Sequence, residues 1–182
     1  MWWFKATLGL LCLSASLSGC GFQPMYGHRA GESVLTHLAA VDVSPMRGLL
    51  GIAMYNHLRD NLTPGGKLRA PRYQLNVEFT TNRAALITAR DSQVRRFNLV
   101  INANYNLLDI GSGSLLKSGV AHSATNYNVV ETSNFATSVA EEAAQLRGVR
   151  QISQQIVWAL SVFFKQRLSS PKKSYESIRP TS

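Results

Sequence analysis

The sequence predicts an α+β fold, a two-layer sandwich with two helices packed on one face of a mostly antiparallel four-stranded sheet. Two segments, residues 73–80 and 97–107, alternate apolar and polar side chains with the period of a half-buried strand. Two others, residues 50–62 and 135–163, repeat apolar side chains every three or four positions, as amphipathic helices do. With the remaining strands the order is β-α-β-β-β-α. A sheet with one apolar face needs helices to cover that face, which favours two layers.

The first part of the chain is typical of a lipoprotein signal peptide. Residues 1–5 carry one positive charge, and residues 6–16 are apolar over about the length that a secretory signal needs. This apolar run is too short to span a bilayer permanently, which takes roughly 20 residues. The Leu-Ser-Gly-Cys motif at residues 17–20 is the pattern that a bacterial lipoprotein peptidase reads: an apolar residue, two small residues and a cysteine that receives diacylglycerol. We therefore expect residues 1–19 to be cleaved.

Cys20 is then the first residue of the mature chain and the site of lipidation. Each buried methylene of its acyl chains, palmitate among them, would contribute about 0.8 kcal/mol to membrane anchoring, so several chains make attachment permanent. Gly21 stands where an aspartate would retain a lipoprotein in the inner membrane under the enterobacterial sorting rule. We therefore predict an outer-membrane, periplasm-facing protein. The alternative is an ordinary signal peptide with a chance cysteine near its end.

The mature chain is long enough for one domain and is strongly basic. Removal of residues 1–19 from 182 leaves 163 residues, divided into a tether at 20–32, a single α+β domain at 33–168 and a disordered basic tail at 169–182. The formal net charge of +9 becomes +8 without Lys5, which suits an anionic partner. Nucleic acid is set aside for a secreted lipoprotein, so anionic lipids and glycolipids come first. The alternative, that the charge only keeps the domain soluble, stays open.

The first strand and helix are expected between residues 33 and 66. Residues 33–43 contain an extended run with Val41 and Val43 on one face. Ser44 and Pro45 then suit the N-cap and the first position of a helix. Proline has no N–H group, but the N–H at the first helical position makes no hydrogen bond within the helix. The helix carries an apolar stripe and ends in a Thr-Pro-Gly-Gly sequence at residues 63–66; the stripe consists of Leu50, Met54, Leu58 and Leu62.

Three strands follow. The strand at residues 73–80 and the longer one at 97–107 have the clearest alternation, and a weaker apolar piece with a polar turn at 89–93 separates them. The Gly-rich sequence at 109–114 predicts a hairpin connection to a returning strand at 115–127.

The last element is a long helix from about Ser133. Its apolar residues step by threes and fours across about eight turns, which is long for a globular helix. Gly148 lies near its middle, and the sequence leaves open whether the helix is continuous, bent or split there.

The residues that usually carry catalysis or bind metal are scattered. Four histidines have no partner at metal-ligand spacing and no paired cysteine: His28, His37, His57 and His122. The Gly66-Lys67 pair lacks the glycine and the Ser/Thr of a phosphate-binding loop, and Gly111-Ser112-Gly113 is best explained as a turn. The sequence therefore predicts no enzyme, no cofactor and no metal site. A lipid-modifying enzyme with an unrecognised site is the remaining alternative.

The N-terminus of the mature chain resembles that of the LptE family of LPS-assembly lipoproteins, in which Cys-Gly-Phe-x-Pro-Leu-Tyr-Gly or a close variant is common. Here Met25 replaces the leucine of that motif in Cys20-Gly21-Phe22-Gln23-Pro24-Met25-Tyr26-Gly27. The order of strands and helices is similar in outline, so the resemblance covers about residues 17–165. It implies a non-enzymatic protein that sits inside the outer-membrane β-barrel LptD, helps that barrel to assemble, places lipopolysaccharide in the outer leaflet and binds it.

Two groups of residues become candidate contacts under this resemblance. On the polar side of the long strand, Asn98, Asn102, Asn104 and Asn106 present both donors and acceptors that suit the polar inner wall of a barrel. A solvated sheet face is the alternative. Near the central hairpin, Arg90, Arg95 and Arg96 suit the phosphates of lipopolysaccharide, because guanidinium groups bind phosphate oxygens in a bidentate way. A solvated loop is the alternative.

The tether adds two more candidate contacts. Phe22 and Tyr26 are expected to pack near the barrel wall or the edge of the domain. One other hypothesis stays open, that the chain is an outer-membrane lipoprotein subunit of a different envelope lipid transporter.

Overall fold

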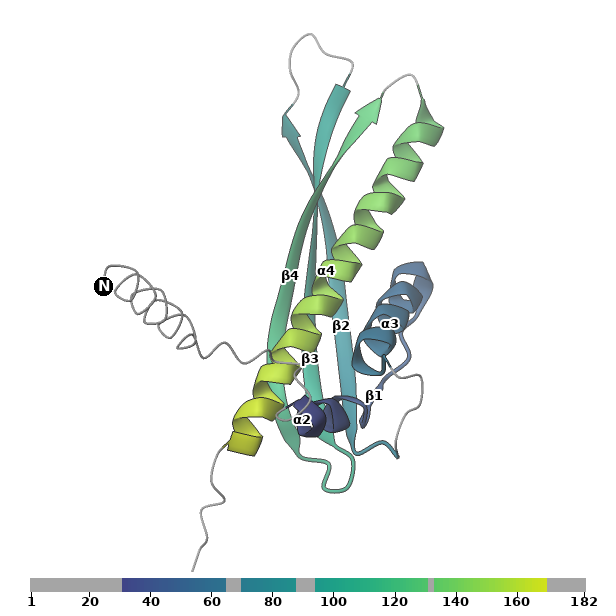
Figure 1. The fold of residues 1–182 in the computed structure, drawn as a ribbon. Helices are drawn as coiled ribbons and strands as arrows, with labels where there is room; N and C mark the ends of the chain where they lie inside the picture. The colour runs from purple at the N-terminus through teal and green to yellow at the C-terminus, as the bar shows by residue number, and fades with distance from the viewer. Residues whose placement is uncertain (1–30, 65–69, 88–93, 131–132, 170–182) are drawn as a thin grey trace, which may run out of the picture. The chain divides into compact units, whose positions relative to one another are not determined.

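The structure, a computed structural model, describes residues 31–64, 70–87, 94–130 and 133–169. The chain divides into two units, Met1–Glu32 and Ser33–Ser182, and the arrangement below concerns the second. Its elements are α2 (Gly31–Leu38), β1 (Val41–Val43), α3 (Gly48–Leu62), β2 (Tyr73–Ile87), β3 (Val94–Asp109), β4 (Leu115–Val130) and α4 (Asn134–Ser169), shown in Figure 1.

The four strands form one mixed sheet in the order β1-β2-β3-β4. Short β1 pairs in parallel with the start of β2, whereas the two long hairpin pairs, β2 with β3 and β3 with β4, are antiparallel. The predicted fold class, a mostly antiparallel four-stranded sheet covered by helices, is confirmed. The parallel pair follows from the connection, since α3 carries the chain back to the same end of the sheet.

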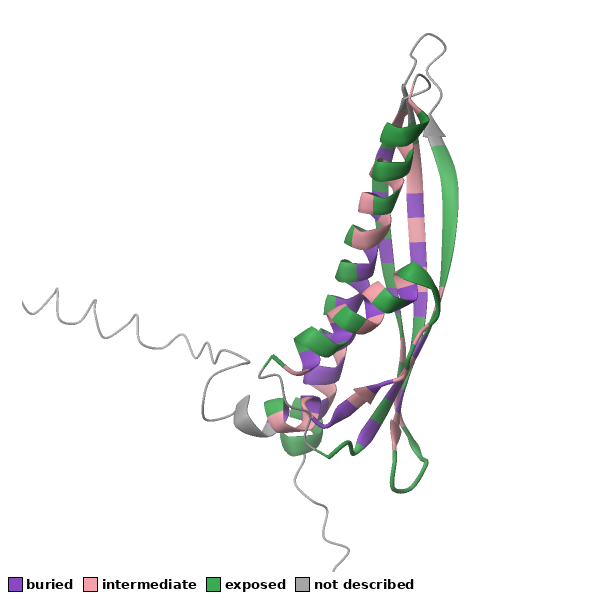
Figure 2. Ribbon diagram, turned by 90° about the vertical axis from the view of Figure 1, so that its right-hand side faces the viewer, coloured by how far each residue is buried: buried purple, intermediate pink, exposed green. Residues whose placement is uncertain are grey.

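The helices α3 and α4 lie on the same side of the sheet (Figure 2). Residues from both helices and from all four strands form one core, in which Leu58 of α3, Ile101 of β3 and Ile156 of α4 are completely buried. Full burial of one such side chain contributes about 1.5–3 kcal/mol, so this shared core fixes the two layers together.

The segment before β1 differs from the prediction. Residues 31–38 are helical, and only Val41–Val43 of the predicted extended run form a strand. Val34 and Leu38, four positions apart, are both buried in the core. That spacing places both side chains on one face of a helix, which explains why a helix forms where the sequence was read as extended.

The prediction that Ser44 caps the first long helix was wrong. Helix α3 begins at Gly48, and its N-cap Arg47 makes no side-chain cap hydrogen bond. Ser44 instead continues the sheet: its N–H donates to the Leu75 carbonyl at 3.0 Å, and its hydroxyl donates to Asn76 Oδ1 at 2.5 Å. Gly48 has a φ of +79°, a conformation that glycine adopts readily and other residues do not.

The strands and the last helix are longer than predicted. β2 continues to Ile87, β3 begins at Val94 and β4 reaches Val130, while the polar turn predicted at 89–93 lies outside the described residues. The predicted hairpin at 109–114 is present, with the Gly113 N–H donating to the Asp109 carbonyl at 2.8 Å. Helix α4 runs through Gly148 as one helix of 36 residues. Residues 170–182 of the predicted tail lie outside the described residues.

Candidate functional site: the open face of the sheet

The sheet has one covered and one uncovered face. Odd-numbered residues of β3, such as Leu99, Ile101 and Tyr105, are buried beneath the helices. Because side chains alternate along a strand, the even-numbered residues point the other way. Figure 2 shows α3 and α4 on one side, and no described element covers the other. We call this other side the open face; it consists of the even-numbered residues of 74–82, 98–106 and 118–128.

The four predicted asparagines of β3 lie together on the open face. Asn104 and Asn106 are exposed, and Asn98 and Asn102 are half-buried. In the strand register, Asn104 lies between Glu78 and Val120, and Asn106 lies between Asn76 and Ser118. The structure therefore places these amides in the middle of a polar surface that crosses three strands.

This surface is nearly free of charge. Within the open face, Glu78 is the only acidic residue, and no lysine or arginine is present. Asn102 Oδ1 and His122 Nδ1 form a lateral hydrogen bond across it at 2.8 Å. At its margins, Ser44 bonds Gln74 and Asn76, and Arg96 bonds Asn128. Amide groups of this kind both donate and accept hydrogen bonds, so the open face can contact another polar surface without needing opposite charge.

The three predicted arginines are not brought together by the described residues. Arg90 and the side chain of Arg95 lie outside them. Arg96, at the start of β3, is exposed and its Nε donates to Asn128 Oδ1 at 3.3 Å. The lipidation site Cys20 and the predicted contacts Phe22 and Tyr26 also lie outside the described residues.

The sequence did not reveal a cluster around Arg83 on the covered face of the sheet. Nη1 of Arg83 donates to Glu141 Oε2 at 3.2 Å and to the Tyr127 hydroxyl at 3.4 Å. The guanidinium also lies 5.1 Å from the centre of the Phe97 ring. These contacts raise the pKa of Arg83, chiefly through the hydroxyl of Tyr127, while burial raises the pKa of Tyr127. The cluster joins β2 to the first turns of α4.

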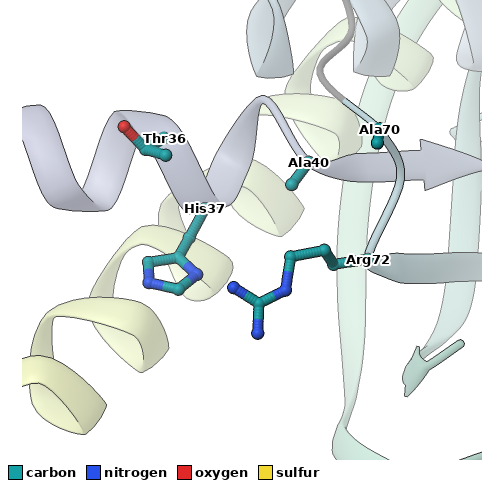
Figure 3. Close-up of a pocket in the computed structure, with 5 residues that line it drawn as sticks. All are labelled: Thr36, His37, Ala40, Ala70 and Arg72. Atoms are coloured by element: carbon teal, nitrogen blue, oxygen red, sulfur yellow. The ribbon is translucent and has the colours of Figure 1, made fainter. Parts of the chain in front are cut away.

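Sequence reasoning also missed a cleft between α2 and the start of β2. It has a volume of about 330 Å³ and is lined by Thr36, His37, Ala40, Ala70 and Arg72 (Figure 3). The imidazole Nδ1 of His37 lies 2.9 Å from the hydroxyl of Tyr73. Burial, Arg72 and Arg167 together hold the pKa of His37 below its ordinary value, with burial the largest cause.

Among the described residues, no three His, Cys, Asp or Glu side chains gather closely enough to hold a metal ion. None of the described helices combines the length and the apolar character that crossing a bilayer requires.

Comparison with solved structures shows the same fold in bacterial lipoproteins. A protein from Caulobacter crescentus CB15, described as a candidate lipoprotein, is 19% identical with a TM-score of 0.59, over 72% of this chain and 95% of that one. Rare lipoprotein B from Shewanella oneidensis is 13% identical with a TM-score of 0.54, over 71% and 97%. At these identities the likeness shows the fold alone.

Comparison of sequences identifies the family. A protein of Rickettsia prowazekii (strain Madrid E) is 26% identical over 157 residues, which are 86% of this chain and 96% of that protein. The family model of LptE, described as lipopolysaccharide-assembly, matches residues 37–160. This match confirms the resemblance seen in the N-terminal motif. Because it covers more than half of the 182 residues, the chain belongs to the LptE family of lipopolysaccharide-assembly proteins.

Proposed function

We propose that this protein is an outer-membrane lipoprotein that sits inside the LptD β-barrel, helps the barrel to assemble and assists insertion of lipopolysaccharide into the outer leaflet. Membership of the LptE family supports the general role in lipopolysaccharide assembly. The open face is the observation that carries the more specific proposal, because it is the large polar surface that the helices leave uncovered. The role is one of binding and support and needs no catalytic residue.

The chemistry of the open face suits the lumen of a barrel. Barrel interiors are polar, with side chains that alternate in and out along each strand. If this face were rich in lysine or glutamate, the barrel wall would need opposite charges at matching positions. The amides of Asn104 and Asn106 need no opposite charge, since each can donate or accept a hydrogen bond according to the group that it contacts. A row of amides on an uncovered sheet face therefore fits a wall of mixed polar groups.

Co-purification from detergent-solubilised membranes tests this role. Asn104→Lys with Asn106→Lys would place two positive charges on the open face, and we expect recovery of the barrel to fall at least five-fold while the domain stays folded. Asn56→Lys with Gln154→Lys, at exposed positions of α3 and α4, is the matched control and should recover the barrel normally. Normal recovery by the double variant would refute the assignment of this face. Recovery of an inner-membrane transporter in place of a barrel would favour the other envelope-transporter role.

We further propose that Arg90, Arg95 and Arg96 contact lipopolysaccharide phosphates. The supporting observation is limited to Arg96, whose exposed side chain lies at the end of the sheet far from β1. Changing all three arginines to glutamate should weaken binding to immobilised lipopolysaccharide. The control changes three exposed arginines on the helix side to glutamate, an equal change of charge: Arg47, Arg59 and Arg150. Equal loss of binding in both triple variants would show that only net charge matters.

The N-terminal assignments need their own tests. Cys20→Ser should abolish incorporation of labelled palmitate into the protein, and continued incorporation would refute lipidation at this residue. Phe22→Ser with Tyr26→Ser should reduce recovery of the barrel while membrane attachment stays normal. Unchanged recovery would remove these two aromatic side chains from the proposed interface.

A further inference from the structure

The cleft between α2 and β2 brings Arg72 and His37 together, with Arg167 of α4 nearby. Among the described residues none of the three makes a salt bridge, although the Asp109 carboxylate is near enough to Arg72 to interact with it electrostatically. Figure 3 shows the guanidinium of Arg72 extending toward the imidazole of His37. Arg167 of α4 is close enough to act electrostatically on the same imidazole. Within the described part of the chain, the one salt bridge is between Arg83 and Glu141, neither of which lines this cleft. An anion bound between Arg72 and the imidazole would be attracted by the Arg72 and Arg167 guanidinium groups and could accept a hydrogen bond from the neutral imidazole.

The buried Tyr73 contacts both the His37 imidazole and the Arg72 guanidinium. The hydroxyl of Tyr73 lies 2.9 Å from Nδ1 of His37, and the Arg72 guanidinium lies 5.8 Å from the centre of the Tyr73 ring. The imidazole also stacks on Phe164, with ring centres 5.3 Å apart and planes 16° from parallel. Because these contacts fix the two side chains beforehand, a ligand loses less binding energy to ordering them.

The remaining lining of the cleft is largely apolar. Ala40 and Ala70 contribute methyl groups beside the two cationic side chains. A volume of about 330 Å³ is at the lower end of the range for small-ligand sites. A free inorganic ion would leave the apolar wall in contact with water. An anion that carries an alkyl chain would fill both parts of the cleft.

We propose that this cleft binds the phosphate head and the adjoining alkyl chain of an anionic amphiphile. Arg72 provides a bidentate contact to the phosphate, since a guanidinium matches two of its oxygens. His37 donates a second hydrogen bond from the nitrogen that does not face Tyr73, and Arg167 adds positive potential from α4. The alkyl chain lies against Ala40 and Ala70.

This site is separate from the arginines near the central hairpin. Arg96, the one of them whose side chain is described, pairs with Ile87 at the opposite end of β2, which has 15 residues and is therefore about 50 Å long at ~3.3 Å per residue. Binding here also does not depend on the open face or on the barrel. Failure of either proposal therefore leaves the other in place.

Titration of the full-length protein in a neutral detergent with hexyl phosphate, inorganic phosphate and hexyl glucoside tests the proposal. Hexyl phosphate should bind at least ten-fold more tightly than either of the other two, which each carry one half of its chemistry. Arg72→Gln should weaken its binding at least ten-fold, and Arg72→Lys should fall between, because lysine keeps the charge without the bidentate geometry. Arg59→Gln is the matched control, since that guanidinium lies 6.0 Å from the Tyr55 ring on α3.

An NMR titration of the His37 imidazole supplies a second readout that does not depend on the arginine variants. Saturating hexyl phosphate should shift the protonation midpoint of His37 upward, because the phosphate stabilises the imidazolium. The proposal would be overturned by an unmoved His37 signal, by equal affinity for hexyl phosphate and inorganic phosphate, or by equal affinity for hexyl phosphate and hexyl glucoside. Equal weakening in Arg59→Gln and Arg72→Gln would also overturn it, as an effect of net charge.

Discussion

Gln155 of α4 makes both hydrogen bonds that a neighbouring strand would make to His122 of β4. Its Nε2 donates to the His122 carbonyl at 2.8 Å, and its Oε1 accepts from the His122 N–H at 3.2 Å. Strand β4 is the last strand of the sheet, so these backbone groups have no partner strand. Farther along β4, Nη2 of Arg147 donates to the Asn126 carbonyl at 3.3 Å. Side chains of α4 thus cover part of an edge that would otherwise be open to pairing with another chain.

Gln155→Ala should therefore both destabilise the domain and open the edge of β4. Two lost hydrogen bonds at roughly 0.5–1.5 kcal/mol each predict a loss of about 1–3 kcal/mol in the free energy of unfolding, measured in urea. Self-association should rise in analytical ultracentrifugation. Gln154→Ala is the control, because that neighbouring side chain is exposed and makes no such contact with β4. Equal stability of the two variants would contradict the edge-covering role.

At Gly148, α4 lies close against the sheet. A β-carbon at this position would lie 2.8 Å from Cδ1 of Ile101 and 3.2 Å from Oγ of Ser123. Gly148→Ala should be nearly neutral, because the end of the Ile101 side chain can shift and alanine favours the helix by about 1 kcal/mol. Gly148→Leu should cost about 1–3 kcal/mol through overpacking, measured by urea denaturation. Gln154→Leu, at an exposed position of α4, should show no such loss; equal losses would argue against a close contact at Gly148.

Periodicity of apolar residues predicted the parts of the fold in which burial repeats regularly along a single strand or helix. Alternation placed Ile101 inside and Asn104 outside correctly, because each strand has one covered face. It could not predict the role of Gly148, since the atoms that crowd a side chain at this position come from two other elements, β3 and β4. Ser44 was misassigned for the same reason: its hydroxyl bonds Asn76, which lies 32 positions later in the chain.

The candidate site was predicted to a similar extent. The asparagine row could be found because it follows the period of a single strand. Arg83 and Glu141 are 58 positions apart, so no local pattern links them. The cleft at His37 could not be predicted because residues 31–38 were expected to be extended, whereas they are helical. Its guanidinium group comes from Arg72, which follows α3 in the sequence and is therefore not near His37 in the chain.

The contact between Arg83 and Glu141 should control how firmly the first turns of α4 are held. Phe135 and Val139 in these turns are largely exposed, so few apolar contacts fix them. Glu141→Gln should therefore speed amide hydrogen exchange across residues 134–143 while exchange around Ile156 stays unchanged. Glu142→Gln, at an exposed neighbouring position, is the control for loss of one carboxylate. Similar acceleration in both variants would show that the ion pair does not hold this end of the helix.

His37 should make the domain less stable as the pH falls below about 6.5, the ordinary pKa of histidine. Burial, Arg72 and Arg167 lower its pKa in the folded state, so the unfolded chain binds a proton at a higher pH than the folded chain does. Its contribution to the free energy of unfolding is therefore complete above pH 6.5 and is lost as the pH falls toward the lowered pKa.

Urea denaturation of the wild type at a series of pH values from 7.5 to about 5 measures this slope. His37→Gln keeps a group that can accept a hydrogen bond from Tyr73 and should flatten the slope over this range. His57→Gln, on α3, controls for loss of one histidine. The hydrogen bonds from Ser112 lower the pKa of Asp109, so the stability that this carboxyl contributes is complete above its ordinary pKa of 3.8 and is lost only below it, outside this window. An unchanged slope in His37→Gln would show that another group causes the acid sensitivity.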